Sequence, residues 1–184
     1  MNKLIIGLVG EIASGKGTVS RYLAENLGAE VFRYSTILRD VLNRLHIEQN
    51  RSNLQLVSKV LRENFGQDLL ARVIAADASK ANSSIVVVDG IRRLEDLTHL
   101  QQLNNFILVK VMADLEVRWQ RIRNRHENPD DQNKTLEQFK ADHEKETEQT
   151  IPSVMAIAHE SLDNNGDEAS LINQVEALLK KYRS

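Results

Sequence analysis

The chain has 184 residues, with 24 Lys and Arg against 26 Asp and Glu, a net charge of −2, and no cysteine. This length fits one domain with a substantial apolar core. The near balance of charge gives no global field favouring nucleic acid or acidic lipid, so we expect neither partner. Without cysteine, a disulfide framework and a thiolate metal site are excluded. No segment is apolar for long enough to span a bilayer, so we expect a cytoplasmic protein.

The first expected element is a strand. Residues 4–9 read LIIGLV, a short run of branched side chains without charge, which is typical of a strand covered on both faces. Val19, Leu23 and Leu27 then recur every four residues, and Gly28 follows them, which predicts a helix that ends there. The apolar spacing predicts further helices within segments 37–45, 54–61 and 69–74.

Two more buried strands are expected, at 85–88 and 106–112, and each is followed closely by an aspartate, Asp89 or Asp114. A capping-box pattern at 135–138 predicts another helix start, and the apolar residues between 171 and 182 predict a final amphipathic helix. Strands that alternate with helices indicate an α/β fold with a parallel central sheet and helices on both faces.

Between the first strand and the first helix lies a glycine-rich loop. Residues 10–16 read GEIASGK, which matches the phosphate-loop pattern GxxxxGK in its required context. Glycine lets successive N–H groups point into one concavity, the helix start adds positive partial charge, and the lysine adds a mobile cation. A plain glycine turn is the alternative. We predict that the loop binds ATP through Gly10, Ala13, Ser14, Gly15, Lys16, Gly17 and Thr18.

Residues 15–18, GKGT, resemble the loop of adenylate kinase and related nucleoside monophosphate kinases. The resemblance implies a three-layer P-loop NTPase fold with about five parallel strands and two mobile segments. The expected core comprises 1–35, 69–120 and 151–184, with an acceptor-binding insertion at 36–68 and a lid at 121–150. Gly17 stands where dephospho-CoA kinases usually have the Ser or Thr that holds magnesium, which argues against membership of that group.

The resemblance continues on the acceptor side. Segment 35–39, STILR, is similar to the family segment whose arginine binds the acceptor phosphate, which implies that role for Arg39. Segment 89–93, DGIRR, is similar to the family's DGFPR, which implies Asp89 near magnesium, through water, and Arg93 near the acceptor phosphate. Arg92 replaces the proline, as in a related group of uncharacterised archaeal-type P-loop kinases with DGIR, so either arginine could serve.

The bland alternatives are an ordinary exposed helix arginine at position 39 and a helix-capping carboxylate at position 89. Gln55 and Arg62 lie on the segment that would cover the acceptor, and they are further candidates for contact with its base or phosphate.

Arg118, Arg121 and Arg125 are spaced to share one helix face, and segment 121–125, RIRNR, resembles the family's RIxGR at the entry to the lid. The resemblance implies that Arg121 and Arg125 cover the donor nucleotide and balance charge on the transferring group. A solvated charged face is the alternative.

The lid departs from the family pattern, because Asn128, next to the Asp130-Asp131 element, and Phe139 stand where the family has arginines. Lys134 or Lys140 would replace them only as point charges. Segment 160–166 resembles the last strand and the loop that contacts the donor base, which implies a contribution from Asn164 to Gly166 to the ATP site. A plain turn is the alternative there.

Together these patterns predict phosphoryl transfer from ATP, assisted by magnesium, to the phosphate of a small nucleoside monophosphate-type acceptor. Two alternatives are a dephospho-CoA kinase-like enzyme that phosphorylates a hydroxyl and a nucleotide-binding adaptor or switch with vestigial kinase activity.

Overall fold

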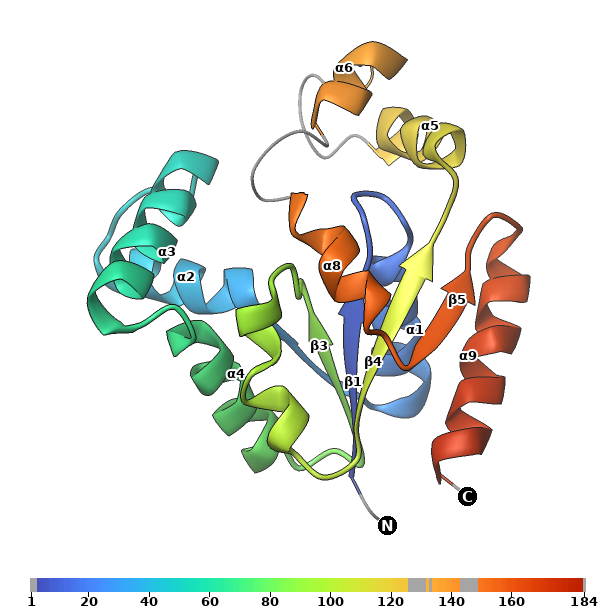
Figure 1. Cartoon of the computed structure of the whole chain (residues 1–184), viewed down its shortest axis with the longest axis horizontal. Coiled ribbons are helices and arrows are strands. Elements are labelled where there is room, and N and C mark those ends of the chain that lie inside the picture. Colours follow the sequence, from blue (N-terminus) through green and yellow to red (C-terminus); the bar gives the residue numbers. More distant parts are fainter. Residues whose placement is uncertain (1–2, 126–131, 133, 143–148, 184) are drawn as a thin grey trace.

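The computed structural model describes residues 3–125, 132, 134–142 and 149–183, and its centre is a five-stranded sheet in which every strand pair is parallel (Figure 1). This confirms the expected α/β class and the parallel sheet of about five strands. The strand order is β2-β3-β1-β4-β5. The strands are β1 (Leu4–Val9), β2 (Glu30–Arg33), β3 (Ile85–Asp89), β4 (Phe106–Met112) and β5 (Glu160–Asp163).

The central strands are buried on both faces, as their apolar runs predict. All six residues of β1 are buried, and so are the first four of β3. Because the strands are parallel, their carboxyl ends meet at one edge of the sheet, where ligands bind in open α/β folds. Val9, Arg33 and Asp89 are the last residues of three adjacent strands at this edge, and Arg33 is the register partner of Asp89.

Helices cover the two faces of the sheet and form two apolar clusters with it. On one face pack α1 (Lys16–Leu27) and α9 (Glu168–Arg183), through residues such as Leu23 and Leu179. The other face is covered by helices and 3-10 turns from several parts of the chain. They are α2 (Tyr34–Arg44), α4 (Leu69–Lys80), α8 (Ile151–Ala156), η1 (Leu94–Leu97) and η2 (Leu100–Gln102).

Helix α3 (Arg51–Phe65) stands out to one side of the sheet, beside α2 (Figure 1). None of its residues is fully buried, and only its half-buried Leu54, Val57 and Leu61 pack against the second cluster. The side chain of Asn50 caps it by accepting a 2.9 Å hydrogen bond from the Asn53 amide. The helix is therefore attached to the rest of the fold along one stripe.

Helices α5 (Leu115–Arg125) and α6 (Leu136–Asp142) lie beyond the carboxyl ends of the strands (Figure 1). The Trp119 indole N–H of α5 donates a 2.8 Å hydrogen bond to the Lys134 carbonyl, just before α6. Phe139 is fully buried, with the Arg118 guanidinium carbon 5.7 Å from its ring centroid. These contacts attach α6 to α5.

Besides the two 3-10 turns, two of the described elements, β2 and α8, have no counterpart among the expected ones. The sequence of β2, EVFR, is four residues long and charged at both ends, so it lacks the apolar run that identifies the other strands. Helix α8 is six residues long and has a proline in its first turn, where proline is tolerated. Among the helices described, none combines the length and the apolar character that crossing a membrane requires.

Candidate active site

The glycine-rich loop joins the end of β1 to the start of α1, at the edge of the sheet where the carboxyl ends of the strands meet. Gly15 has a φ of +108°, a conformation that L-residues rarely adopt, and a Cβ there would overlap the side-chain amide of Asn164. A Cβ at Gly10 would meet the Val111 carbonyl oxygen and, at 2.7 Å, the Ser14 hydroxyl. Ala13 also has a positive φ, 60°. The two glycines are therefore required by close approach of neighbouring groups.

Lys16 is the first residue of α1, and its ammonium lies against the loop. Its Nζ donates hydrogen bonds to the carbonyl oxygens of Gly10, at 2.6 Å, and Glu11, at 3.0 Å. The N-cap residue, Gly15, has no side chain, so it does not cap the first backbone amides of α1. A cation and a helix N-terminus thus meet at the same loop, which is the arrangement that binds anions.

Asn164, in the loop after β5, supports the glycine-rich loop. This side chain is 5% exposed, and its Nδ2 donates a 2.8 Å hydrogen bond to the Ser14 carbonyl. Nη2 of Arg121 donates to the Asn164 carbonyl at 2.8 Å and to its Oδ1 at 3.3 Å. The structure therefore brings three predicted site residues, Ser14, Arg121 and Asn164, into one connected group. Gly166 lies further along the same loop and is exposed.

Two buried polar atoms in this group have no hydrogen-bond partner within the described part of the chain. They are the Ser14 hydroxyl and Nη1 of Arg121. Burial also lowers the pKa of Arg121 from its ordinary value, because desolvation disfavours the charged form. Unsatisfied buried donors are uncommon in folded proteins, and a catalytic role or a bound water or ion is among the explanations for them.

Arg118 was expected on the same helix face as Arg121, and the structure places it between the loop and α6. It is 4% exposed, and its Nη2 forms a 3.1 Å ion pair with Glu11. Its Nε donates to the Ala113 carbonyl at 3.0 Å, and its Nη1 donates to the Ile12 carbonyl at 3.4 Å. This arginine therefore ties the glycine-rich loop to the start of α5.

Of the other residues expected in the lid, the structure describes only some. Arg125 is the last residue of α5, and its side chain lies outside the described residues, as do Asn128, Asp130 and Asp131. Lys134 is half-buried and Lys140 is exposed. Phe139, where the family resemblance would place an arginine, is a core residue of the α5–α6 contact.

Asp89 ends β3, one residue before Gly90, whose φ is +90°. Its side chain is 14% exposed and forms a 3.2 Å ion pair with Nε of Arg33, at the end of β2. Arg33 is not among the site residues that the sequence predicts, because the sequence does not predict β2 either. No group of three or more His, Cys, Asp or Glu side chains within the described residues is arranged to hold a metal ion.

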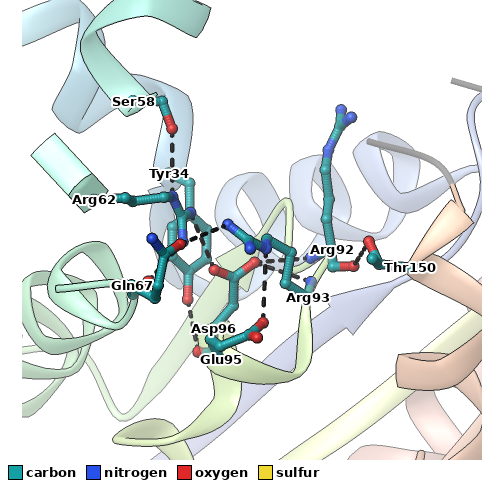
Figure 2. A network of polar contacts seen from close by, with 9 residues as sticks. All are labelled: Tyr34, Ser58, Arg62, Gln67, Arg92, Arg93, Glu95, Asp96 and Thr150. Atoms are coloured by element: carbon teal, nitrogen blue, oxygen red, sulfur yellow. Dashed lines mark hydrogen bonds and ion pairs between the residues drawn. The ribbon is translucent and has the colours of Figure 1, made fainter. Parts of the chain in front are cut away.

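The loop after Gly90 carries Arg92 and Arg93, and a buried carboxylate organises it (Figure 2). Asp96 is 2% exposed, and its Oδ2 accepts hydrogen bonds from the backbone amides of Arg92 and Arg93, each at 3.1 Å. Its Oδ1 forms a 3.2 Å ion pair with Arg62 of α3. The hydroxyl of Tyr34 donates to the Asp96 carbonyl at 2.9 Å.

The four arginines predicted on the acceptor side differ in their contacts. Arg62 is largely buried and bound to Asp96, with a further 2.8 Å hydrogen bond to the Gln67 carbonyl. The Arg93 guanidinium contacts the Gln67 side chain at 3.4 Å and Glu95 at 3.6 Å. In Figure 2 the Arg92 side chain extends away from this network, while its carbonyl accepts a 2.7 Å hydrogen bond from Thr150.

Arg39 and Gln55 are both exposed and lie outside the Asp96 network. Nη1 of Arg39 donates a 3.4 Å hydrogen bond to the side chain of Gln49, in the connection that leads to α3. The structure therefore gathers Arg62, Arg92 and Arg93 around one loop and leaves the other two acceptor candidates, Arg39 and Gln55, on the surface of α2 and α3.

Comparison with known proteins agrees with this geometry. Residues 9–140 match a family described as an AAA domain. A UPF0200 protein of Methanosarcina acetivorans is 36% identical over 128 residues, which cover 68% of this chain and 68% of the relative. A second, from Methanosarcina barkeri, is 28% identical over 180 residues, which cover 97% of this chain and 95% of the relative.

Among solved structures, the shikimate kinase from Bacteroides thetaiotaomicron superposes with a TM-score of 0.64 at 14% sequence identity, covering 98% of this chain and 99% of that chain. This likeness shows that the chain has the fold of P-loop kinases.

Proposed function

Because the chain belongs to the AAA domain family and to the UPF0200 proteins, we propose that it is a kinase that transfers the γ-phosphoryl group of ATP to the phosphate of a nucleoside monophosphate-type acceptor. The observation that carries this proposal is the glycine-rich loop with Lys16 at its mouth, supported from behind by Asn164. A GxxxxGK loop in this context binds the phosphates of nucleotides.

On the donor side, the residues present fit a polyphosphate. Close packing at Gly10 and Gly15 fixes the loop, and the Lys16 ammonium rests on carbonyl oxygens that a phosphate oxygen could replace. The Ser14 hydroxyl, which has no partner among the described residues, is a further donor within the loop. Lys16 therefore holds the outer phosphates, and the amides at the start of α1 hold the inner ones.

Asp89 is the proposed magnesium residue, through water, because it is a carboxylate at the carboxyl end of the strand beside β1. When bound, magnesium would neutralise charge on the phosphates. Arg121, and Arg125 at the end of α5, would supply positive charge on the donor side. Since phosphoryl transfer requires positioning and charge balance more than covalent chemistry, these are the kinds of group that the reaction needs.

On the acceptor side, we assign direct contact with the acceptor phosphate to Arg39, Arg92 and Arg93, and contact with the base to Gln55. Arg62 acts one step further away, because its guanidinium is bound to Asp96 and shapes the loop that carries Arg92 and Arg93. We propose that segment 36–68 moves over the acceptor, together with the lid within 121–150, and so excludes water.

A hydroxyl acceptor is the second candidate. Dephospho-CoA is one such acceptor, and the solved structure of similar fold is named a shikimate kinase. In this reading Asp89 would accept the proton of the attacking hydroxyl.

A panel assay tests the proposal. ADP formation is measured with ATP and magnesium, for wild type and Lys16→Ala, in the presence of each common nucleoside monophosphate, dephospho-CoA or shikimate. We expect at least one monophosphate to stimulate ADP formation in wild type only. Stimulation by a hydroxyl compound alone would select the second candidate. If no acceptor acts and ATP instead tightens binding to a macromolecule, the protein is a nucleotide-dependent adaptor.

A further inference from the structure

Arg33 and Asp89 lie opposite each other at the ends of β2 and β3. No sequence pattern identifies Arg33 as a site residue. The two residues are register partners in the parallel pair, and their side chains form an ion pair at 3.2 Å. β3 lies next to β1, which leads into the glycine-rich loop, so Arg33 is two strands away from that loop. At the usual spacing between strands this separation is about 10 Å.

The two side chains differ in their exposure to solvent. The Asp89 side chain is 14% exposed, whereas that of Arg33 is 49% exposed. Arg33 contacts Asp89 through Nε, and the structure records no contact of its two Nη groups within the described residues. The pair compensates the charge of a largely buried carboxylate, while most of the planar guanidinium fork is left available.

A magnesium ion near Asp89 would change this balance. Two cations beside one carboxylate repel each other, so arrival of the metal weakens the hold of Asp89 on Arg33. A released guanidinium at this edge of the sheet presents its fork to an anion, and phosphate matches the fork in bidentate geometry.

Two other arginines near the carboxyl ends of the strands have buried partners. Arg62 is bound to Asp96, and Arg118 is buried against Glu11 and Ile12. Because both side chains are largely buried, we infer that their role is structural. Arg33 is half exposed and is held by one carboxylate, Asp89, for which a metal would compete.

We propose that Arg33 is a switching residue of the active site. Before the metal binds, it neutralises Asp89 and competes with the metal for that carboxylate. After the metal binds, Arg33 turns to the anionic group of the acceptor, which assigns the acceptor to compounds that carry a phosphate. This inference rests on the proposed function, since it takes Asp89 as the residue that receives the metal.

The first test measures metal affinity. Free Mn²⁺ is followed by electron paramagnetic resonance as it is titrated into wild type, Arg33→Ala, Arg33→Lys and the control Arg21→Ala, with and without saturating ADP. Arg21 is an exposed arginine on α1. If Arg33 competes with the metal, Arg33→Ala lowers the half-saturating Mn²⁺ concentration several-fold. Arg33→Lys, which keeps the charge, stays close to wild type.

The second test measures anion affinity. AMP, and separately inorganic phosphate, is titrated by calorimetry into the same proteins saturated with Mn²⁺ and ADP. Here both Arg33→Ala and Arg33→Lys should bind the probe about 10-fold or more weakly, because a lysine cannot reproduce two parallel charge-assisted hydrogen bonds. The control should match wild type.

The two readouts separate the possible results. Unchanged or weaker Mn²⁺ binding in Arg33→Ala overturns the proposal, because a purely structural ion pair would give that result. Equal probe affinity in wild type and both variants also overturns it. If wild type binds no ADP, the proposed function fails, and the Mn²⁺ titration without nucleotide still decides whether Arg33 competes for Asp89.

Discussion

The side-chain amide of Asn164 donates a 2.8 Å hydrogen bond to the Ser14 carbonyl and thereby joins the loop after β5 to the glycine-rich loop, 150 residues earlier in the chain. The same amide fills the space that a side chain at Gly15 would need. The shape of the candidate phosphate site therefore depends on a residue near the other end of the sequence.

Gly15→Ala should destabilise the protein and weaken nucleotide binding. Its φ of +108° disfavours any L-residue, and the added methyl would displace Asn164. Strain of this kind costs about 1–3 kcal/mol, and the lost hydrogen bond to Ser14 adds to it. Chemical denaturation measures the free energy of unfolding, and calorimetry measures ADP affinity.

The matched control is Gly17→Ala, two residues along, where a Cβ would meet no atom within 4 Å. Alanine favours helix, so the free energy of unfolding should stay the same or rise by up to about 1 kcal/mol. Equal destabilisation by the two substitutions would contradict the role given to Asn164.

Lys16→Ala should leave the fold intact and weaken ADP binding by about 10- to 100-fold, the range expected for the loss of a charge-assisted hydrogen bond to phosphate. The ammonium lies on the loop itself, 2.6 Å from the Gly10 carbonyl, so its removal takes away positive charge at the site. Lys59→Ala, on the exposed face of α3, is the control. Calorimetry measures the affinity for ADP, and circular dichroism checks that the fold is intact. Wild-type ADP affinity in Lys16→Ala would contradict the assignment of this loop to the phosphate site.

Asp96→Asn should cost about 3–5 kcal/mol, because it leaves Arg62 without its charged partner at a site where the two side chains are 11% and 3% exposed. The amides of Arg92 and Arg93 can still donate to the carboxamide oxygen, so their positions change less. Denaturant titration measures the loss.

Glu95→Gln, one residue away, removes a carboxylate of a different kind. Its partner is Arg93 at 3.6 Å, and the two side chains are 48% and 37% exposed, so the expected cost is below about 1 kcal/mol. Similar losses in the two variants would show that burial of the Asp96–Arg62 pair is unimportant.

Glu160→Gln should lower stability at neutral pH, and the difference from wild type should disappear in acid. Hydrogen bonds from Lys181, at 2.5 Å, and Tyr182, at 2.6 Å, hold the pKa of Glu160 below its ordinary value of 4.5. A depressed folded-state pKa gives stability that is present above the unfolded pKa and lost as pH falls through the folded one.

Urea titrations between pH 7 and pH 2 measure this dependence, and Glu25→Gln, an exposed position on α1, controls for loss of a charge alone. A difference between wild type and Glu160→Gln that persists at the acid end would contradict the assigned contribution.

The central fold could be predicted from the sequence because its signals are local. The apolar run of β1, the GxxxxGK pattern and the periodic spacing in α1 lie within 25 consecutive residues, and each reports the structure of its own segment. The same holds for β3 and the aspartate at its end.

The site could be predicted only in part, because several of its contacts join distant segments. The partner of Arg62 is 34 residues away, and nothing in the pattern of α3 distinguishes a phosphate-binding arginine from one committed to Asp96. Arg33 was missed together with β2, whose four residues show neither an apolar run nor a clean alternation. Phe139 occupies a position that family resemblance associates with charge, yet it is buried.

The Asp96–Arg62 pair also constrains the design of chimeric proteins. If the segment with α2 and α3 were replaced by that of another protein of this fold, Arg62 would be lost and a carboxylate would be left buried beneath the loop of Arg92 and Arg93. The graft has to bring its own cation to that point, or Asp96 has to be replaced along with the segment. Before any chimera is made, a replacement segment can therefore be checked for a cation at the position of Arg62 on α3.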